Sequence, residues 1–265
     1  MLGHMPSVSN APSVPPPVIE VAVAVAFDRY HDLGAVNLAL LAQAWKEEFP
    51  VLREVPGAPP QLLDPRTQGI EFGTGPMPTR LWLMSLAGND LVQIQNDLLI
   101  YNWRLVQPGD VYPGHQWILQ KFEELWSDFV RRLGEYGPMV PRLVEWTYVD
   151  KLGLSKPSNN LLTFVDESIS MLPGSGSNLS FQVVRELKSG DAVHGFLAVQ
   201  GSPARQQGDV EDFFALNITT KLDTKGAAAD DVPRILLDAH DVSFEAFTCV
   251  VPTYRREEEG VGGES

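Results

Sequence analysis

The chain of 265 residues contains a single cysteine, Cys249, which excludes an intramolecular disulfide and a thiolate metal cage. No stretch reaches the roughly 18 to 20 uninterrupted apolar residues that span a bilayer. The first residues lack the charged and apolar regions of a secretory signal, and Gly3-His4-Met5 has the form of a tag remnant or of a natural start. These absences predict a cytoplasmic protein without a membrane partner.

Basic residues are also scarce, with 20 Lys and Arg against 34 Asp and Glu, a formal net charge of -14. Residues 1–150 and 151–265 each carry 10 basic and 17 acidic side chains, so the negative charge is spread over the surface. Proteins that grip a phosphate backbone need a basic face. The composition therefore disfavours a nucleic-acid partner and favours a basic protein partner.

Local catalytic signatures are missing as well. The chain has no GxGxxG, GxxxxGK[ST], HExxH, GxSxG or CxxC sequence. This favours a protein that is not an enzyme, and it predicts no catalytic residue, no cofactor and no metal site. The 44% of hydrophobic residues, including 12 Phe and 6 Trp, is nevertheless that of a folded chain with a sizeable core.

Periodicity predicts an α+β protein with a large, mostly antiparallel sheet. The first half has the order β-α-β-β-β-α-β, with a Pro-rich loop or lid at residues 50–79 that contains seven of the 21 prolines. The second half has the order β-β-β-β-α. We expect strands at residues 18–27, 80–86, 91–95, 98–106, 142–149, 161–170, 179–187, 192–199 and 213–222, and helices at 33–49, 113–136 and 230–251.

The predicted domain covers residues 18–252, between a disordered lead-in at 1–17 and a disordered tail at 253–265. One continuous sheet, with all helices packed on it, is the simplest arrangement. Two subdomains at 18–150 and 151–252 remain an alternative, as does a tandem of two related halves about a pseudo-twofold axis.

A polar and aromatic ledge is the first candidate ligand site. Gln93, Gln95, Asp97, Tyr101 and Trp103 alternate along neighbouring strands, and alternate residues of one strand project to one face. The same residue types are equally typical of an exposed face or a partner surface.

His240 is the second candidate, because it lies on the apolar stripe of the last helix close to Asp238, Asp241 and Glu245. A buried histidine near carboxylates could serve as a general base. The more common explanation is a core imidazole with hydrogen-bonded ring nitrogens, and the same applies to His115. The stretch from Gly174 to Ser177 could cradle an anion or be a plain connection.

Several short motifs occur together in this chain. They are PPVIEV at 16–21, LVQIQND at 91–97 with NWR at 102–104, Tyr112-Pro113, LVEWTYV at 143–149, and LDAH at 237–240 with Phe244 and Phe247. Together they resemble a sporadically distributed bacterial protein family of about 250 residues with no assigned activity. The resemblance implies this architecture and an accessory role, such as one in toxin–antitoxin or defence systems. The chain has Asp150 where the family's pattern has Asn.

Two functions follow as hypotheses. The first is a non-catalytic interaction protein whose acidic surface binds a basic partner. The second is a small-molecule sensor or enzyme with a pocket between the sheet and the last helix, beneath the Pro-rich loop. Its pocket would be bounded by Gln93, Gln95, Tyr101, Trp103 and His240.

Overall fold

A computed structural model of the chain describes residues 17–58, 63–67, 79–107, 109–153, 180–204 and 213–251. Within these ranges, nine strands form one antiparallel sheet and three α-helices pack on it, so the α+β prediction is confirmed. The elements are β1 (Val18–Phe27), α1 (Ala35–Gln43), β2 (Val51–Pro56), η1 (Pro65–Thr67), β3 (Thr79–Met84), β4 (Asp90–Gln95), β5 (Leu98–Arg104), α2 (His115–Leu133), η2 (Gly134–Tyr136), β6 (Pro141–Gly153), β7 (Phe181–Ser189), β8 (Ala192–Ala204), β9 (Phe213–Asp223), η3 (Ala229–Asp231) and α4 (Val232–Val250).

The strand order is symmetric about the centre of the sheet. The order is β2-β3-β4-β5-β1-β6-β9-β8-β7, and the central strands β1 and β6 pair antiparallel with each other. In each half the first strand, β1 or β6, lies at the centre of the sheet. The last strand of that half, β5 or β9, pairs with it, and the strands in between in the sequence follow outward in reverse order. A long helix, α2 or α4, then follows the last strand of each half. One continuous sheet and two topologically related halves therefore describe the same molecule.

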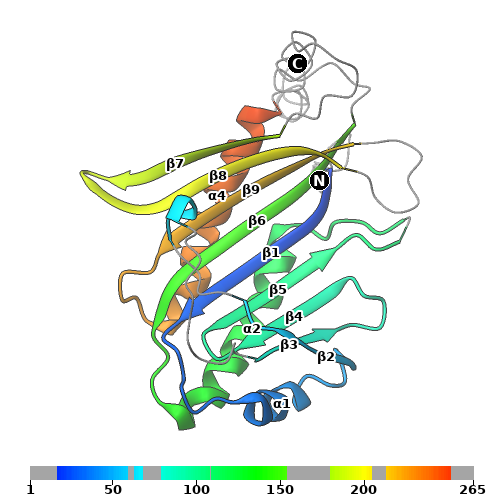
Figure 1. Cartoon of the computed structure of the whole chain (residues 1–265), viewed down its shortest axis with the longest axis vertical. Coiled ribbons are helices and arrows are strands. Elements are labelled where there is room, and N and C mark those ends of the chain that lie inside the picture. The colour runs from blue at the N-terminus through cyan, green and yellow to red at the C-terminus, as the bar shows by residue number, and fades with distance from the viewer. Residues whose placement is uncertain are drawn as a thin grey trace, which may run out of the picture.

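All three helices lie on the same side of the sheet, which we call the helix face (Figure 1). The apolar stripe predicted for α2 is buried there, with Ile118, Phe122 and Phe129 inaccessible to solvent. From β1, Val21, Val23 and Val25 point to this core, because alternate residues of a strand share a face. The other side, which faces the viewer in Figure 1, we call the opposite face.

Helix α1 corrects one prediction. It covers only Ala35–Gln43, and the chain continues in turns to Phe49. Of the apolar residues at helical spacing, Val36 and Leu40 are exposed, whereas Leu41 is buried together with Leu38. A helix that packs at the margin of a sheet buries a narrow stripe, so its apolar spacing alone does not say which side is inward.

The second correction concerns residues 50–79, predicted as one long loop. Val51–Pro56 forms the edge strand β2, which pairs with β3. A proline is tolerated at the end of an edge strand because no further ladder bond is needed there. The remaining proline-rich residues are described only at 57–58 and 63–67.

The other predicted elements agree with the structure to within a few residues. The exception is β8, which was predicted to end at residue 199 and continues to Ala204. The expected strand at 161–170, the Gly174–Ser177 stretch, the tail at 253–265 and all but the last residue of the lead-in at 1–17 lie outside the described residues. Among the helices that are described, none combines the length and apolarity needed to cross a membrane.

Candidate functional site

The five residues predicted to line one pocket lie on two faces of the sheet. In the β4–β5 hairpin, Gln93 pairs with Ile100 and Val92 pairs with Tyr101. Paired residues share a face, so Gln93 is separated from Tyr101 by the sheet itself. The prediction of a common ledge is wrong, because the two-residue turn at Asn96-Asp97 pairs odd-numbered residues with even-numbered ones.

Gln93 and Gln95 lie on the opposite face, whereas Tyr101, Trp103 and His240 lie on the helix face. Ala58, a described residue of the Pro-rich segment, also contacts the opposite face, because its N–H donates to Gln95 Oε1 at 2.8 Å. At the other edge of the sheet, Arg66 of η1 forms an ion pair with Glu186 of β7 at 3.1 Å (Figure 1). The described part of this segment therefore does not cover His240.

His240 belongs to a cluster of rings between α2, α4 and the central strands. Its ring stacks on that of His115, the first residue of α2, with 4.0 Å between ring centroids. It meets Trp146 and Tyr148 of β6 edge-on at 5.2 Å and 6.1 Å. Phe244, one turn along α4, stacks on its other side at 6.0 Å. The result is a continuous stack from Phe244 through His240 to His115.

The electrostatics of this stack favour neutral imidazoles. Burial lowers the pKa of His240 more than the hydrogen bond to the Asp241 carboxylate raises it, and the nearby His115 lowers it further. Burial likewise lowers the pKa of His115. Asp241 Oδ1 lies 2.8 Å from His240 Nδ1 and fixes the orientation of the ring. These contacts make His240 a packing residue that holds α4 on α2, and the described residues contain no group of metal ligands.

The cluster continues from Tyr148 through Tyr112 to Trp103. Tyr112 and Tyr148 share a hydrogen bond between their hydroxyls at 3.3 Å, and Trp103 meets Tyr112 edge-on at 5.6 Å. Burial and the neighbouring Tyr112 raise the pKa of Tyr148 well above its usual value. Two of the five predicted site residues, Trp103 and His240, thus join one aromatic cluster as parts of its packing.

Asp150 is a buried acid that sequence reasoning did not single out as a site residue. It follows Trp146 and Tyr148 with the alternation of β6, so its side chain points to the helix face. It is 1% exposed, and its Oδ2 has no hydrogen-bond partner in the described part of the chain. Burial raises its pKa to about 7. Its position in the period-2 pattern of an apolar strand is the signal that could have placed it in the core.

The outward side of α4 carries exposed apolar and acidic side chains together. Leu237 and Phe244, about two turns apart, are each 38% exposed. The exposed carboxylates of Asp238, Asp241 and Glu245 lie between and beside them. We call these five residues the α4 surface. The apolar stripe predicted from 236 to 251 therefore extends beyond the core, and part of it faces solvent.

Charge on this helix is only partly compensated. Arg234 is the one basic side chain of α4, and it contacts Asp238 at 3.4 Å. Asp241 is bonded to His240, and Glu245 has no basic partner among the described residues. One positive against three negative charges leaves α4 at -2 with His240 neutral. Exposed apolar groups within a negative rim are the features of a surface for a basic, amphipathic partner.

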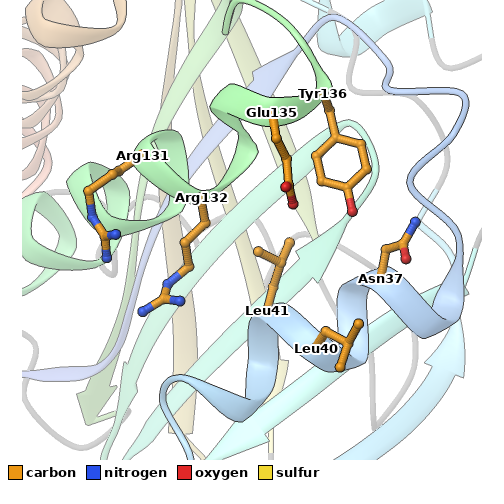
Figure 2. Close-up of a pocket in the computed structure, with 7 residues that line it drawn as sticks. All are labelled: Asn37, Leu40, Leu41, Arg131, Arg132, Glu135 and Tyr136. Carbon is orange, nitrogen blue, oxygen red and sulfur yellow. The ribbon is translucent and has the colours of Figure 1, made fainter.

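A separate hollow of about 310 Å³ lies between α1 and the end of α2 (Figure 2). None of the five predicted ligand-binding residues lines it. Both of its arginines, Arg131 and Arg132, form ion pairs with Asp128, so their positive charges are already paired. The remaining charged group of its lining is the carboxylate of Glu135, which forms no ion pair with a described residue. Its lining residues are Asn37, Leu40, Leu41, Arg131, Arg132, Glu135 and Tyr136.

Comparisons with known proteins return no match: no family model, no curated protein and no solved structure is similar to this chain. The function has to be inferred from the surfaces described above.

Proposed function

We propose that the protein is a non-catalytic interaction protein that binds a basic, amphipathic segment of a partner protein through the α4 surface. The observation that carries this proposal is the pair Leu237 and Phe244, exposed two turns apart on a helix whose other outward groups are mainly carboxylates. A helical partner segment offers apolar side chains at the same repeat, and its lysines or arginines would meet the acidic rim.

The stack beneath the surface supports the same proposal. Phe244 rests on His240, which rests on His115 and is oriented by Asp241. An apolar anchor held rigid before binding loses little side-chain entropy when a partner covers it. In this proposal His240 is a positioning residue for the anchor and has no catalytic role. The net charge of -14 attracts a basic partner from a distance.

The test uses two labelled helical peptides of the same length, one with leucine and lysine at amphipathic spacing and one with glutamate in place of lysine. Fluorescence anisotropy measures their affinity for the intact chain at low and high salt. We expect only the lysine peptide to bind, and we expect binding to weaken as salt is added. The double variant Asp238→Lys/Glu245→Lys should lower the affinity by about tenfold or more, and Phe244→Ala by a similar factor.

A matched control changes the same net charge elsewhere. Asp32→Lys/Asp191→Lys replaces two exposed carboxylates outside α4 and should reduce the affinity much less. Equal losses in both double variants would show that only the total charge matters and would refute the α4 surface. No binding of the lysine peptide would refute the proposal as a whole.

A further inference from the structure

A second group of unsatisfied side chains lies on the opposite face, at the corner formed by β2, β3 and β4. Arg53 pairs with Trp82 across β2 and β3, and Trp82 pairs with Gln93 across β3 and β4, so all three side chains share that face. Arg80 precedes Trp82 by two residues on the same strand, and its guanidinium carbon lies 5.8 Å from the centre of the Trp82 ring. These four residues, Arg53, Arg80, Trp82 and Gln93, we call the β3 corner.

Three polar atoms of the β3 corner are buried and have no hydrogen-bond partner among the described residues. They are Nε of Arg80, Nε1 of Trp82 and Oε1 of Gln93. Gln93 as a residue is only 8% exposed to solvent. The large majority of buried side-chain polar atoms in proteins are hydrogen-bonded, because leaving one unpaired costs the free energy of removing it from water. Two unpaired donors and one unpaired acceptor on neighbouring residues of one face therefore point to a ligand that would pair with them.

The orientation of Gln93 is set by a hydrogen-bond chain from the central strand. Asn102 Nδ2 donates to the Glu20 carboxylate at 2.9 Å, and Gln93 Nε2 donates to Asn102 Oδ1 at 2.8 Å. Because a carboxylate only accepts, each amide of the chain is forced to turn its N–H toward Glu20. The remaining oxygen of Gln93 is thereby presented as an acceptor.

The charge of the corner is unusual for this protein. Neither Arg53 nor Arg80 forms an ion pair with any described residue, although the chain carries a net charge of -14. Glu54 follows Arg53 on β2 and pairs with Leu81 of β3. Its side chain therefore points to the helix face, away from both arginines. Gln95, the neighbouring amide on β4, is already bonded to Ala58 and Asp97. Two guanidinium groups without an ion pair and one indole N–H without an acceptor in the described part of the chain therefore lie on one face, and these are groups that recognise an anion.

We propose that the β3 corner binds a small carboxylic acid that bears a hydroxyl or amino group beside its carboxylate. The carboxylate accepts from the Arg80 guanidinium and the Trp82 indole N–H, with Arg53 adding positive charge. The neighbouring O–H or N–H donates to Gln93 Oε1. Glu20 and Asn102 are positioning residues for that oxygen. This site lies on the other side of the sheet from the α4 surface and does not depend on it.

The experiment follows the indole N–H resonance of Trp82 by NMR as small acids are added to the full chain. The probes are a panel of 2-hydroxy and 2-amino carboxylic acids, each beside the same acid without that substituent. We expect at least one substituted acid to shift the Trp82 signal and to bind about tenfold more tightly than its unsubstituted partner, as the loss of one hydrogen bond to a buried acceptor requires. The signal is assigned with Trp82→Phe.

Variants separate the two halves of the site. Arg80→Gln should abolish binding of every acid, whereas Arg185→Gln, which removes an exposed arginine of β7, should leave it unchanged. Asn102→Ala frees the Gln93 amide, so it should erase the preference for the substituted acid while carboxylate binding persists. Urea unfolding midpoints establish that each variant is folded, and Arg80→Lys serves as a second variant, which keeps the charge but loses the planar fork.

Three outcomes would overturn the proposal. They are no shift of Trp82 with any acid, binding that survives in folded Arg80→Gln, and equal affinity for substituted and unsubstituted acids. Since the α4 surface is tested with peptides on the other face, failure of either proposal leaves the other standing.

Discussion

Asp150 is a buried carboxyl group whose raised pKa should make the stability of the protein depend on pH. Its carboxyl group lies among apolar side chains on the helix face, and burial raises its pKa from 3.8 to about 7. The folded chain therefore keeps the proton over a range in which the unfolded chain has lost it. The sign follows from linkage: this group's contribution to stability is fully present below about pH 4 and is lost as the pH rises to about 7.

We expect Asp150→Asn to stabilise the protein at about pH 8 by on the order of 3 kcal/mol, and to change its stability little at about pH 4. The physical reason is that the amide fills the same space without a charge to desolvate. Urea unfolding at the two pH values measures the difference. Asp191→Asn, at an exposed position, is the control and should show no comparable change with pH. A destabilised Asp150→Asn at about pH 8 would mean that the charge has a partner.

At the same scale, the sequence predicted the burial of His240 but not its neighbour. Its place on the apolar stripe of the last helix was enough to expect a core imidazole, and it is 4% exposed. That His115, 125 positions earlier, stacks on it at 4.0 Å follows only from how α2 and α4 cross. The helical period placed His240 on the inward side of α4, and it says nothing about which residue of another element lies against it.

At the scale of elements, close packing between strands leaves no room for a side chain at Gly195 of β8. A Cβ atom there would lie 2.5 Å from the backbone oxygen of Lys221 and 2.6 Å from the Leu222 side chain, both on the neighbouring strand β9. The backbone oxygen cannot move without breaking the ladder between β8 and β9.

Gly195→Ala should therefore destabilise the protein by about 1–3 kcal/mol, as overpacking of a well-packed site does. Gly134→Ala is the matched control, because Gly134 has helical backbone angles and open space around its Cα. It should be neutral or stabilising by a few tenths to about 1 kcal/mol. Thermal and urea unfolding compare the two. Equal effects would show that the contact at β8 relaxes at little cost.

Element types were largely predictable, and element exposure was not. The alternation of β1 and the stripe of α2 are local patterns, and both elements appear where they were predicted. Val36 and Leu40 of α1, in contrast, and Leu237 and Phe244 of α4 are apolar residues at helical spacing that remain exposed. Whether such a stripe is covered depends on the neighbour, which the stripe does not specify.

At the scale of the whole molecule, β1 and β6 join the two halves through a ladder that runs from Val18 to Phe27, is regular from Glu20 to Ala26 and shifts in register at each end. The main core draws residues from both halves, including Trp126 of α2 and Leu236 of α4. Neither half can separate without exposing this core and the unpaired edge of a central strand. The molecule should therefore unfold as one unit even though its strand order is that of two related halves.

The tryptophans make this testable. All six lie between Trp45 and Trp146, so their fluorescence reports on the first half and on β6, whereas far-UV circular dichroism reports on all strands and helices. We expect the two probes to give coincident urea transitions, as two-state unfolding requires. Two separated transitions would show that β7, β8, β9 and α4 unfold independently of the rest.

Composition and periodicity were enough to predict the fold class, the position of most strands and helices, and the acidity of the chain. These properties depend on residue content and on periods of two or 3.6 residues, which act over a few neighbours. The three-dimensional packing was needed to learn that β1 pairs with β6, that His115 stacks on His240, and that Gln93 and Tyr101 point to different sides of the sheet. The first two are contacts between residues far apart in the chain, chosen by the packing of whole elements. The third depends on strand register, which changes the face of every side chain when it shifts by one residue.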